Sequence, residues 1–156
     1  MELILQPSVL WDESITLEMK MKKIFLVIAI VLIALASCSN ASADITGGWK
    51  LVSYGDASNP TPAIQNVDTL IRFESNGQVG GNVGCNSFGG NYEMSGDTIA
   101  FNSIISTMMF CEGASAQETA VLGIFSDNVK LPVHLNGDTV TITSANGDSA
   151  VTLARK

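Results

Sequence analysis

The chain is organised around Gly80-Gly81-Asn82-Val83-Gly84-Cys85-Asn86-Ser87-Phe88-Gly89-Gly90-Asn91-Tyr92, where five glycines surround one cysteine. Glycine adopts backbone conformations that other residues reach only at a cost. Glycines that gather between two strand-like segments favour bulges, tight bends and close approach of one backbone to another. Residues 80–92, the glycine corner, are therefore expected to form a bend in a β-sheet.

The segment 19–38 has the pattern of an export signal. Three lysines follow Met19, and then comes an uncharged apolar run, 24–35. That run is short for a transmembrane helix, which needs about 20 apolar residues, but typical of a signal peptide. It ends in Leu-Ala-Ser-Cys38, which resembles a prokaryotic lipobox and implies cleavage before Cys38 with lipid attached to its sulfur. The alternative is an ordinary signal peptide or uncleaved anchor with an incidental cysteine.

The segments on either side of this signal complete the expected organisation. Residues 1–18 carry four acidic residues ahead of the basic stretch, which is abnormal for an export signal, so we expect an incorrectly assigned start codon. Residues 19–37 are the expected signal peptide, and 38–47 are small and polar, as a tether would be. One β domain is expected over 48–156.

The charge of the expected mature chain excludes one class of partner. From Cys38 onward, five basic and eleven acidic residues give a net charge of −6. The charges stand singly among turn residues, and no basic patch occurs. Nucleic acid is therefore not an expected partner.

Most of the remaining sequence alternates apolar and polar residues with the period of a β-strand. Asn76-Gly77, Gly96-Asp97, Asn136-Gly137 and Asn146-Gly147 favour hairpin turns between these segments. The segments are 49–54, 69–74, 78–83, 91–94, 98–101, 106–110, 130–135, 139–143 and 150–154. Pro132 would place 130–135 at an edge or a bulge.

One segment has helical period instead. Ser115 and Glu118 match a capping box, and Val121, Leu122 and Phe125 follow at helical spacing. We expect one amphipathic helix over 115–127, with the Glu118 carboxylate capping its start. About eight antiparallel strands plus this helix predict a mainly β fold, a small barrel or strongly curled sheet with one inserted helix.

Several motifs occur in the order that the META domain, or HslJ-like, family shows, and the chain resembles that family over about 48–154. The matching residues are Trp49, Gly84, Cys85, Asn86, Phe88, Gly90, Tyr92, Thr107, Met109, Cys111 and Glu118. The resemblance implies a small antiparallel β domain with one helix, located outside the cytoplasm and often lipidated. The family is linked to stress tolerance and drug resistance. Phe110 departs from the pattern, because a smaller residue usually precedes the second cysteine.

The cysteines support two interpretations. With Cys38 lipidated, Cys85 and Cys111 remain as an even pair in an oxidising compartment, and we expect them to form a disulfide. The alternative is two buried free thiols.

A copper(I) site at Cys85, Cys111, Met108 and Met109 is a second alternative, because these are soft ligands. A strand over 106–110 would separate the two methionines, so core methionines are favoured, and no metal or cofactor is expected.

Catalytic residues are not indicated by the sequence. His134, the single histidine, lies in a plain strand and is expected at the surface. A glycosidase needs two carboxyl groups that converge in a cleft, and the sequence offers only candidates by default, Glu74, Glu93 and Glu112. Trp49 and Tyr92 are expected core aromatics, although either would also suit a ligand pocket.

We therefore expect a non-enzymatic, membrane-anchored lipoprotein that acts by binding an envelope protein or another envelope component. The alternatives are a carrier of a small apolar ligand in the barrel mouth and, with less support, a hydrolase.

Overall fold

The computed structural model describes residues 20, 22–23, 43–125 and 128–156. Contacts divide the chain into two units, 1–40 and 41–156. In the first unit, the described lysines at 20, 22 and 23 are helical. The segment 1–18, the rest of the expected signal peptide and the expected lipidation site Cys38 lie outside the described residues. No described helix is long and apolar enough to cross a bilayer.

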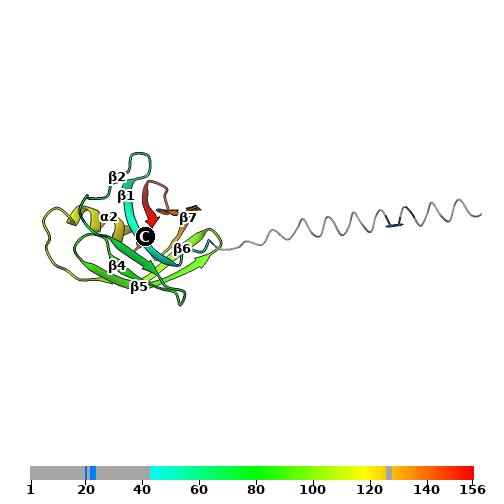
Figure 1. Cartoon of the computed structure of the whole chain (residues 1–156), viewed down its shortest axis with the longest axis horizontal. Coiled ribbons are helices and arrows are strands. Elements are labelled where there is room, and N and C mark those ends of the chain that lie inside the picture. The colour runs from blue at the N-terminus through cyan, green and yellow to red at the C-terminus, as the bar shows by residue number, and fades with distance from the viewer. Residues whose placement is uncertain (1–19, 21, 24–42, 126–127) are drawn as a thin grey trace, which may run out of the picture. The chain divides into compact units, whose positions relative to one another are not determined.

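The second unit is a closed antiparallel barrel of eight strands, with a ninth strand of two residues that pairs with β1 (Figure 1). The mainly β barrel with one helix is thus confirmed. β2 pairs with β1 alone, and β1 pairs directly with β3. From β3 to β9 each strand pairs with the next one in the chain, and β1 pairs with β9 to close the barrel. The strands are β1 Gly47–Asp56, β2 Thr61–Pro62, β3 Leu70–Phe73, β4 Gln78–Asn82, β5 Ser87–Ser95, β6 Thr98–Ser106, β7 Lys130–Asn136, β8 Thr139–Thr143 and β9 Ser149–Arg155.

The glycine corner forms the last three residues of β4, the bend after it and most of β5. Gly81 shows why glycine is needed there: its φ is +146°, and a Cβ on it would lie 1.8 Å from the Leu70 carbonyl oxygen. The backbones of β3 and β4 approach so closely at this point that no side chain fits. Gly81 therefore fixes the pairing of β3 with β4.

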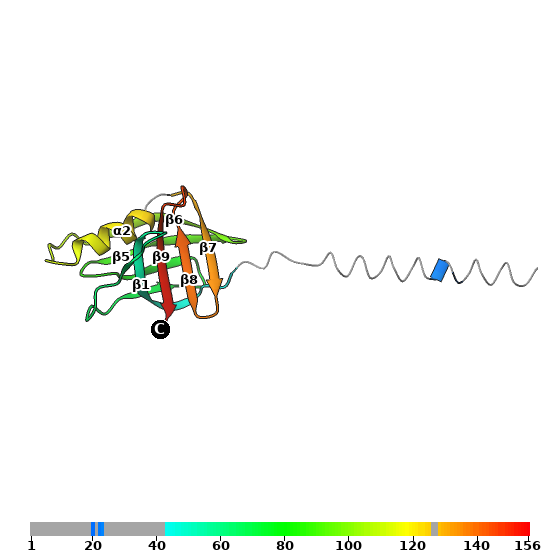
Figure 2. The same ribbon diagram turned by 90° about the horizontal axis from the view of Figure 1, so that it is seen from above.

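The helix α2, Ser115–Phe125, lies between β6 and β7 in the chain and contacts β1, β6 and β9 (Figure 2). Its apolar residues Val121, Ile124 and Phe125 are buried. The expected helix is confirmed as far as Phe125, and residues 126–127 are not described. The helix thereby carries part of the core of the barrel.

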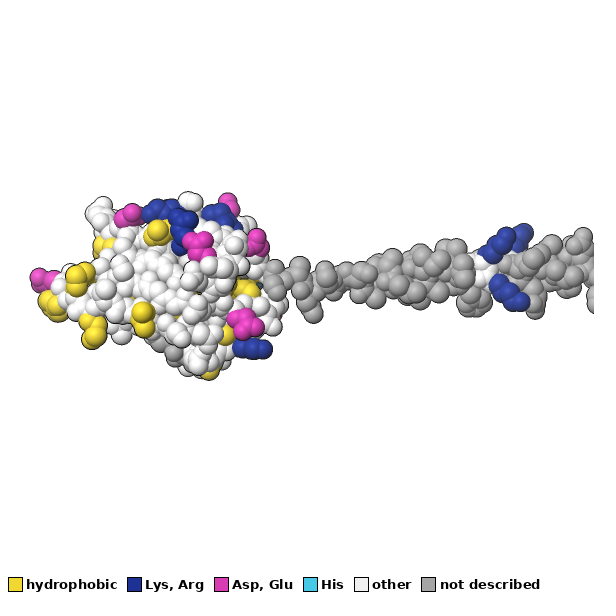
Figure 3. Space-filling view, turned by 90° about the horizontal axis from the view of Figure 1, so that it is seen from below, with side chains coloured by type: hydrophobic (Ala, Val, Ile, Leu, Met, Phe, Trp, Pro, Cys, Tyr) yellow, Lys and Arg dark blue, Asp and Glu magenta, His cyan; other side chains and the backbone are white. Residues whose placement is uncertain are grey.

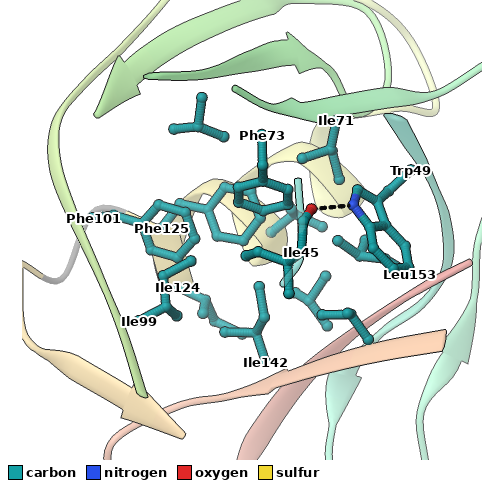
Figure 4. Packing of buried hydrophobic residues seen from close by; sticks show 14 of the residues in the cluster. Ile45, Trp49, Ile71, Phe73, Ile99, Phe101, Ile124, Phe125, Ile142 and Leu153 are labelled. Atoms are coloured by element: carbon teal, nitrogen blue, oxygen red, sulfur yellow. Dashed lines mark hydrogen bonds between the residues drawn. The ribbon is translucent and has the colours of Figure 1, made fainter. Parts of the chain in front are cut away.

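The core is built around stacked aromatic rings and a tryptophan (Figure 4). The rings of Phe101 and Phe125 stack with centroids 4.3 Å apart. Trp49 is fully buried and donates its indole N–H to the carbonyl of Ile45 at 2.7 Å. Ile45 is 1% exposed, so the domain begins before residue 47, where the sequence placed the end of the tether.

The position of Pro132 in β7 resembles an edge, as predicted, although β7 as a whole is not an edge strand. Residues 130–132 pair with β6, and the ladder with β8 begins only at Val133, so Pro132 is paired on one side alone. Val133 next to it donates to the carbonyl of Asp97. The predicted strand 106–110, in contrast, is wrong: β6 continues to Ser106, and 107–111 has no regular structure.

Candidate functional site

The bend between β4 and β5 is joined to the segment before α2 by a disulfide. Cys85 and Cys111 are bonded, and their Cα atoms lie 6.2 Å apart, within the usual range for disulfides. The bond closes a loop with a sequence separation of 26. In the chain-entropy model, a loop of this length stabilises the fold by about 3.5 kcal/mol. The free-thiol and copper alternatives therefore do not apply to these two sulfurs.

The carboxylate of Glu118, in the first turn of α2, binds the same bend. Its Oε1 accepts from the backbone N–H of Cys85 at 2.6 Å and from that of Asn86. Its Oε2 accepts from the Asn86 amide at 2.9 Å. The predicted capping box is therefore wrong. The carboxylate turns away from its own helix because the buried N–H groups of the bend need an acceptor.

Gly84 allows the helix to come this close. A Cβ at Gly84 would lie 2.8 Å from Cγ of Glu118 and 3.2 Å from the Cβ of Ala114. A larger residue would push Glu118 away from the N–H groups that it accepts from. This glycine serves the contact between the bend and α2.

Asn86 connects this bend to the segment after β6. Its Oδ1 accepts from the Thr107 hydroxyl and from the Met109 N–H, each at 2.8 Å. Its Nδ2 donates to the Met109 carbonyl at 3.0 Å. The N–H and the carbonyl of Met109 thus both bind the side chain of Asn86. In the predicted strand 106–110 these two groups would have paired with a neighbouring strand, so that strand does not form.

Both side chains at the centre of this network are buried: Asn86 is 7% and Glu118 is 8% exposed. Burial alone would raise the pKa of Glu118. Hydrogen bonds from the Asn86 backbone, the Asn86 side chain and the Cys85 backbone outweigh it and hold the pKa below its ordinary value. The carboxylate is therefore ionised at neutral pH, and both of its oxygens are engaged.

This lowered pKa predicts a dependence of stability on pH. Ionised Glu118 stabilises the fold above the pKa of the unfolded chain, about 4.3, and this contribution is lost as the pH falls through the lower pKa of the folded state. Between about pH 5 and pH 3, wild type should lose more free energy of unfolding than Glu118→Gln. Urea unfolding of both proteins at each pH measures this. Parallel curves would contradict the role of the carboxylate.

Gln117, to which no role was assigned from the sequence, is fully buried. Its Oε1 accepts from the Ile64 N–H at 2.8 Å, and its Nε2 donates to the Val83 carbonyl. Gln117 lies one helical turn before Val121, on the buried face of α2. A polar residue on the apolar face of a predicted helix was the signal that could have identified it.

The segment held by Asn86 exposes large apolar side chains. Met108 is 96%, Phe110 90%, Ile105 75% and Met109 60% exposed. These four side chains define the docking loop, 105–110, which comprises the last two residues of β6 and the segment that follows it. Figure 3 shows hydrophobic side chains projecting at an end of the domain. The expectation that the methionines belong to the core is wrong, because without a strand neither has a face that turns inward.

A hollow of about 350 Å³ adjoins the docking loop. Its walls are formed by that loop on one side and the first turns of α2 on the other. The lining residues are Asn86, Ser106, Thr107, Met108, Met109, Phe110, Ser115, Glu118, Thr119 and Leu122.

The remaining motif residues serve the core. Phe88 is buried against Phe125, with ring centroids 5.8 Å apart. Tyr92 is partly buried edge-on against Phe73 and donates its hydroxyl to the Glu74 carbonyl at 2.9 Å. A Cβ at Gly90 would lie 2.5 Å from Cδ1 of Ile104. Of the motif, only Gly84, Cys85, Asn86, Thr107, Met109, Cys111 and Glu118 gather around the bend.

The catalytic candidates take no part in this cluster. His134 is exposed on β7, and Glu74, Glu93 and Glu112 are exposed as well. Glu74 lies 3.9 Å from Arg72. Among the described residues, no group of three or more His, Cys, Asp or Glu is placed to hold a metal ion.

From residue 43 onward, the described part of the chain is a small β domain, a closed antiparallel barrel with one helix and a disulfide-bonded bend. The META domain family profile matches residues 43–156, and the chain belongs to this family. No curated protein matches the chain.

Solved structures share the fold. A protein from Burkholderia xenovorans, solved by NMR, has a TM-score of 0.58 at 20% identity, covering 70% of this chain and 81% of that one. A crystal structure of a DUF4847 family protein from Bacteroides vulgatus has a TM-score of 0.51 at 13% identity, covering 71% and 93%. At these identities the likeness concerns the fold alone.

Proposed function

We propose that this protein is an extracytoplasmic lipoprotein whose META domain acts by binding a protein through the docking loop, in envelope stress tolerance, and not by catalysis. The observation that carries the proposal is the contrast at Met109. Its backbone N–H and carbonyl are both bound by buried Asn86, while the side chains around it are exposed. A loop held in one conformation loses less entropy when it binds.

The exposed side chains themselves support binding. Apolar residues that cluster at a surface mark interaction sites more often than apolar residues that are scattered singly. Three of the four, Met108, Met109 and Phe110, are consecutive, and Ile105 is close in the chain. Phenylalanine and methionine are enriched in the buried centres of protein interfaces.

The lipid anchor is supported by the sequence before the domain. Cys38 follows a lipobox-like tripeptide and is the one cysteine outside the disulfide. Four residues separate it from Ala43, where the described part of the domain begins. Disulfides persist in oxidising compartments, which agrees with a location outside the cytoplasm.

The two alternatives have less support. A carrier would need an apolar cavity in the barrel, but the side chains of Phe73, Phe101 and Phe125 pack there. A glycosidase-type hydrolase would need a carboxyl group that exchanges protons with a substrate. Glu118 lines the hollow, but its oxygens are engaged by Cys85 and Asn86 and its pKa is lowered.

A complementation experiment tests the proposal. Cells that lack the gene would produce the full chain, Cys38→Ala or Phe110→Ser. We expect labelled palmitate in the full chain and Phe110→Ser but not in Cys38→Ala, and loss of tolerance to envelope stress in both variants. Val52→Ser, at a 43% exposed residue outside the docking loop, is the matched control and should retain both properties. Unlabelled full chain would contradict the anchor, and a fully tolerant Phe110→Ser strain would contradict the docking loop.

A further inference from the structure

We propose that the docking loop binds a second copy of this chain, with Met108 and Phe110 of each copy lying in the hollow of the other about a two-fold axis. This inference rests on the proposed function, because it identifies the partner of the same surface. A two-fold contact needs one surface that is complementary to itself.

The shape of the surface meets this requirement. Phe110 is 90% exposed, and the hollow that it borders has a volume of about 350 Å³. Pockets that hold small ligands have volumes of about 300–1,000 Å³, so the hollow is large enough for a side chain. Leu122 and Thr119 form its wall on the α2 side. A projection and a recess thus lie side by side, as an interface between identical surfaces requires.

The distribution of charge favours a second copy over a bilayer. The expected mature chain has a net charge of −6, so two copies repel each other over most of their surfaces. Residues 98–111 contain no charged residue, and the carboxylate in the hollow is engaged by Cys85 and Asn86. Two copies that meet here therefore bring no charged side chain of residues 98–111 together, and the nearest exposed carboxylate in the chain, that of Glu112, lies just beyond this stretch. Binding to anionic lipids uses clustered Lys and Arg, and these positions have none.

The position of Ala43, where the described part of the domain begins, is compatible with a two-fold contact at the docking loop. The Ala43 N–H donates to the carbonyl of Gly96, in the turn between β5 and β6. The docking loop follows the other end of β6, whose nine residues span about 30 Å. A two-fold contact at the docking loop therefore leaves Ala43 of both copies outside the interface. Four side chains bury less than the roughly 800 Å² per partner of a stable interface, so confinement on the membrane is needed to populate the dimer.

Photo-crosslinking of the full chain in its own membrane tests the inference. The photoreactive residue p-benzoylphenylalanine would replace Phe110, and, as a control, Val52 on β1, which is 43% exposed. After irradiation, we expect the residue-110 variant to form a covalent dimer of twice the mass. Peptide mapping should join residue 110 to residues 115–122 of the second copy. The residue-52 variant should remain a monomer.

A second substitution tests the recess. Thr119 is exposed and lines the hollow, so Thr119→Arg should fill it without disturbing the core. Added to the residue-110 variant, it should lower the yield of the dimer about tenfold, equivalent to about 1.4 kcal/mol. An unchanged yield would overturn the proposed geometry. A crosslink to lipid or to a different protein would overturn the dimer, and in the second case protein binding by the loop would stand. If residue 110 crosslinked to no protein at all, both the dimer and protein binding by the docking loop would be contradicted.

Discussion

Glu118→Ala is expected to lower the free energy of unfolding by about 3–5 kcal/mol, because the substitution leaves buried donors without an acceptor. The donors are the N–H groups of Cys85 and Asn86 and the Asn86 side-chain amide. Domains of this size are stable by only about 5–15 kcal/mol, so the loss is a large part of the total. Urea unfolding monitored by tryptophan fluorescence measures it, because Trp49 is fully buried.

Two variants separate this effect from a general loss of charge. Glu112→Ala removes an exposed carboxylate from the same segment and should change the free energy of unfolding by less than about 0.5 kcal/mol. Glu118→Gln keeps one acceptor oxygen but places an NH₂ group beside Asn86, so an intermediate loss of about 1–3 kcal/mol is expected. Equal effects of Glu112→Ala and Glu118→Ala would show that the network contributes nothing.

Gly81→Ala is expected to be more destructive still, with a loss above about 4 kcal/mol. The added Cβ would lie 1.8 Å from the oxygen and 2.8 Å from the carbon of the Leu70 carbonyl. Both are backbone atoms, so β3 and β4 would have to separate. The backbone at Gly81, with φ of +146°, is also strained for alanine. Circular dichroism and urea unfolding should show a largely unfolded protein at 25 °C.

Gly89→Ala is the matched control in the adjacent strand β5. A Cβ there would approach no atom closer than 4.0 Å, and Gly89 has no positive φ. The substitution should be neutral or should stabilise by about 0.4–1 kcal/mol, because alanine restricts the unfolded chain. If Gly89→Ala were as destabilising as Gly81→Ala, the stability lost in Gly81→Ala would be a general effect of replacing a strand glycine and not a result of the close contact with β3.

The barrel could be predicted from the sequence because its signals are local. Asn76-Gly77 and Asn136-Gly137 mark turns between alternating segments, and Gly77 and Gly137 do have positive φ. In β8, Val140 and Ile142 are buried as the alternation predicts. These patterns need no knowledge of which strands meet in space.

The docking loop could not be predicted in the same way. Residues 106–110 of this loop have the composition of a short strand, and the structure they take depends on Asn86, which lies 23 residues before Met109. Glu118 was misassigned for a related reason. Ser115 and Glu118 fit a local capping pattern, but the unsatisfied N–H groups of the distant bend attract the carboxylate more strongly. Long-range hydrogen bonds overrode local patterns at both places.

The cysteine pair shows an intermediate case. Counting cysteines predicted that Cys85 and Cys111 are bonded, and the disulfide is present. The count gave no indication that the bond lies next to a buried carboxylate and beside an exposed apolar loop. The pairing could be predicted from the even number of remaining cysteines and the expected oxidising compartment. The residues around the bond depend on how α2 packs against the bend, and a count of cysteines contains no information on that packing.

The most direct test of the central claim, that Asn86 and Glu118 hold the docking loop in place, is amide hydrogen exchange at Met109 in the folded protein. The side chain of Met109 is 60% exposed, but its N–H donates to Asn86 at 2.8 Å. We expect its exchange to be slowed at least about a hundredfold relative to an unstructured peptide, and to become fast in Asn86→Ala. Exchange in the wild-type protein at the rate of an unstructured peptide would contradict the claim.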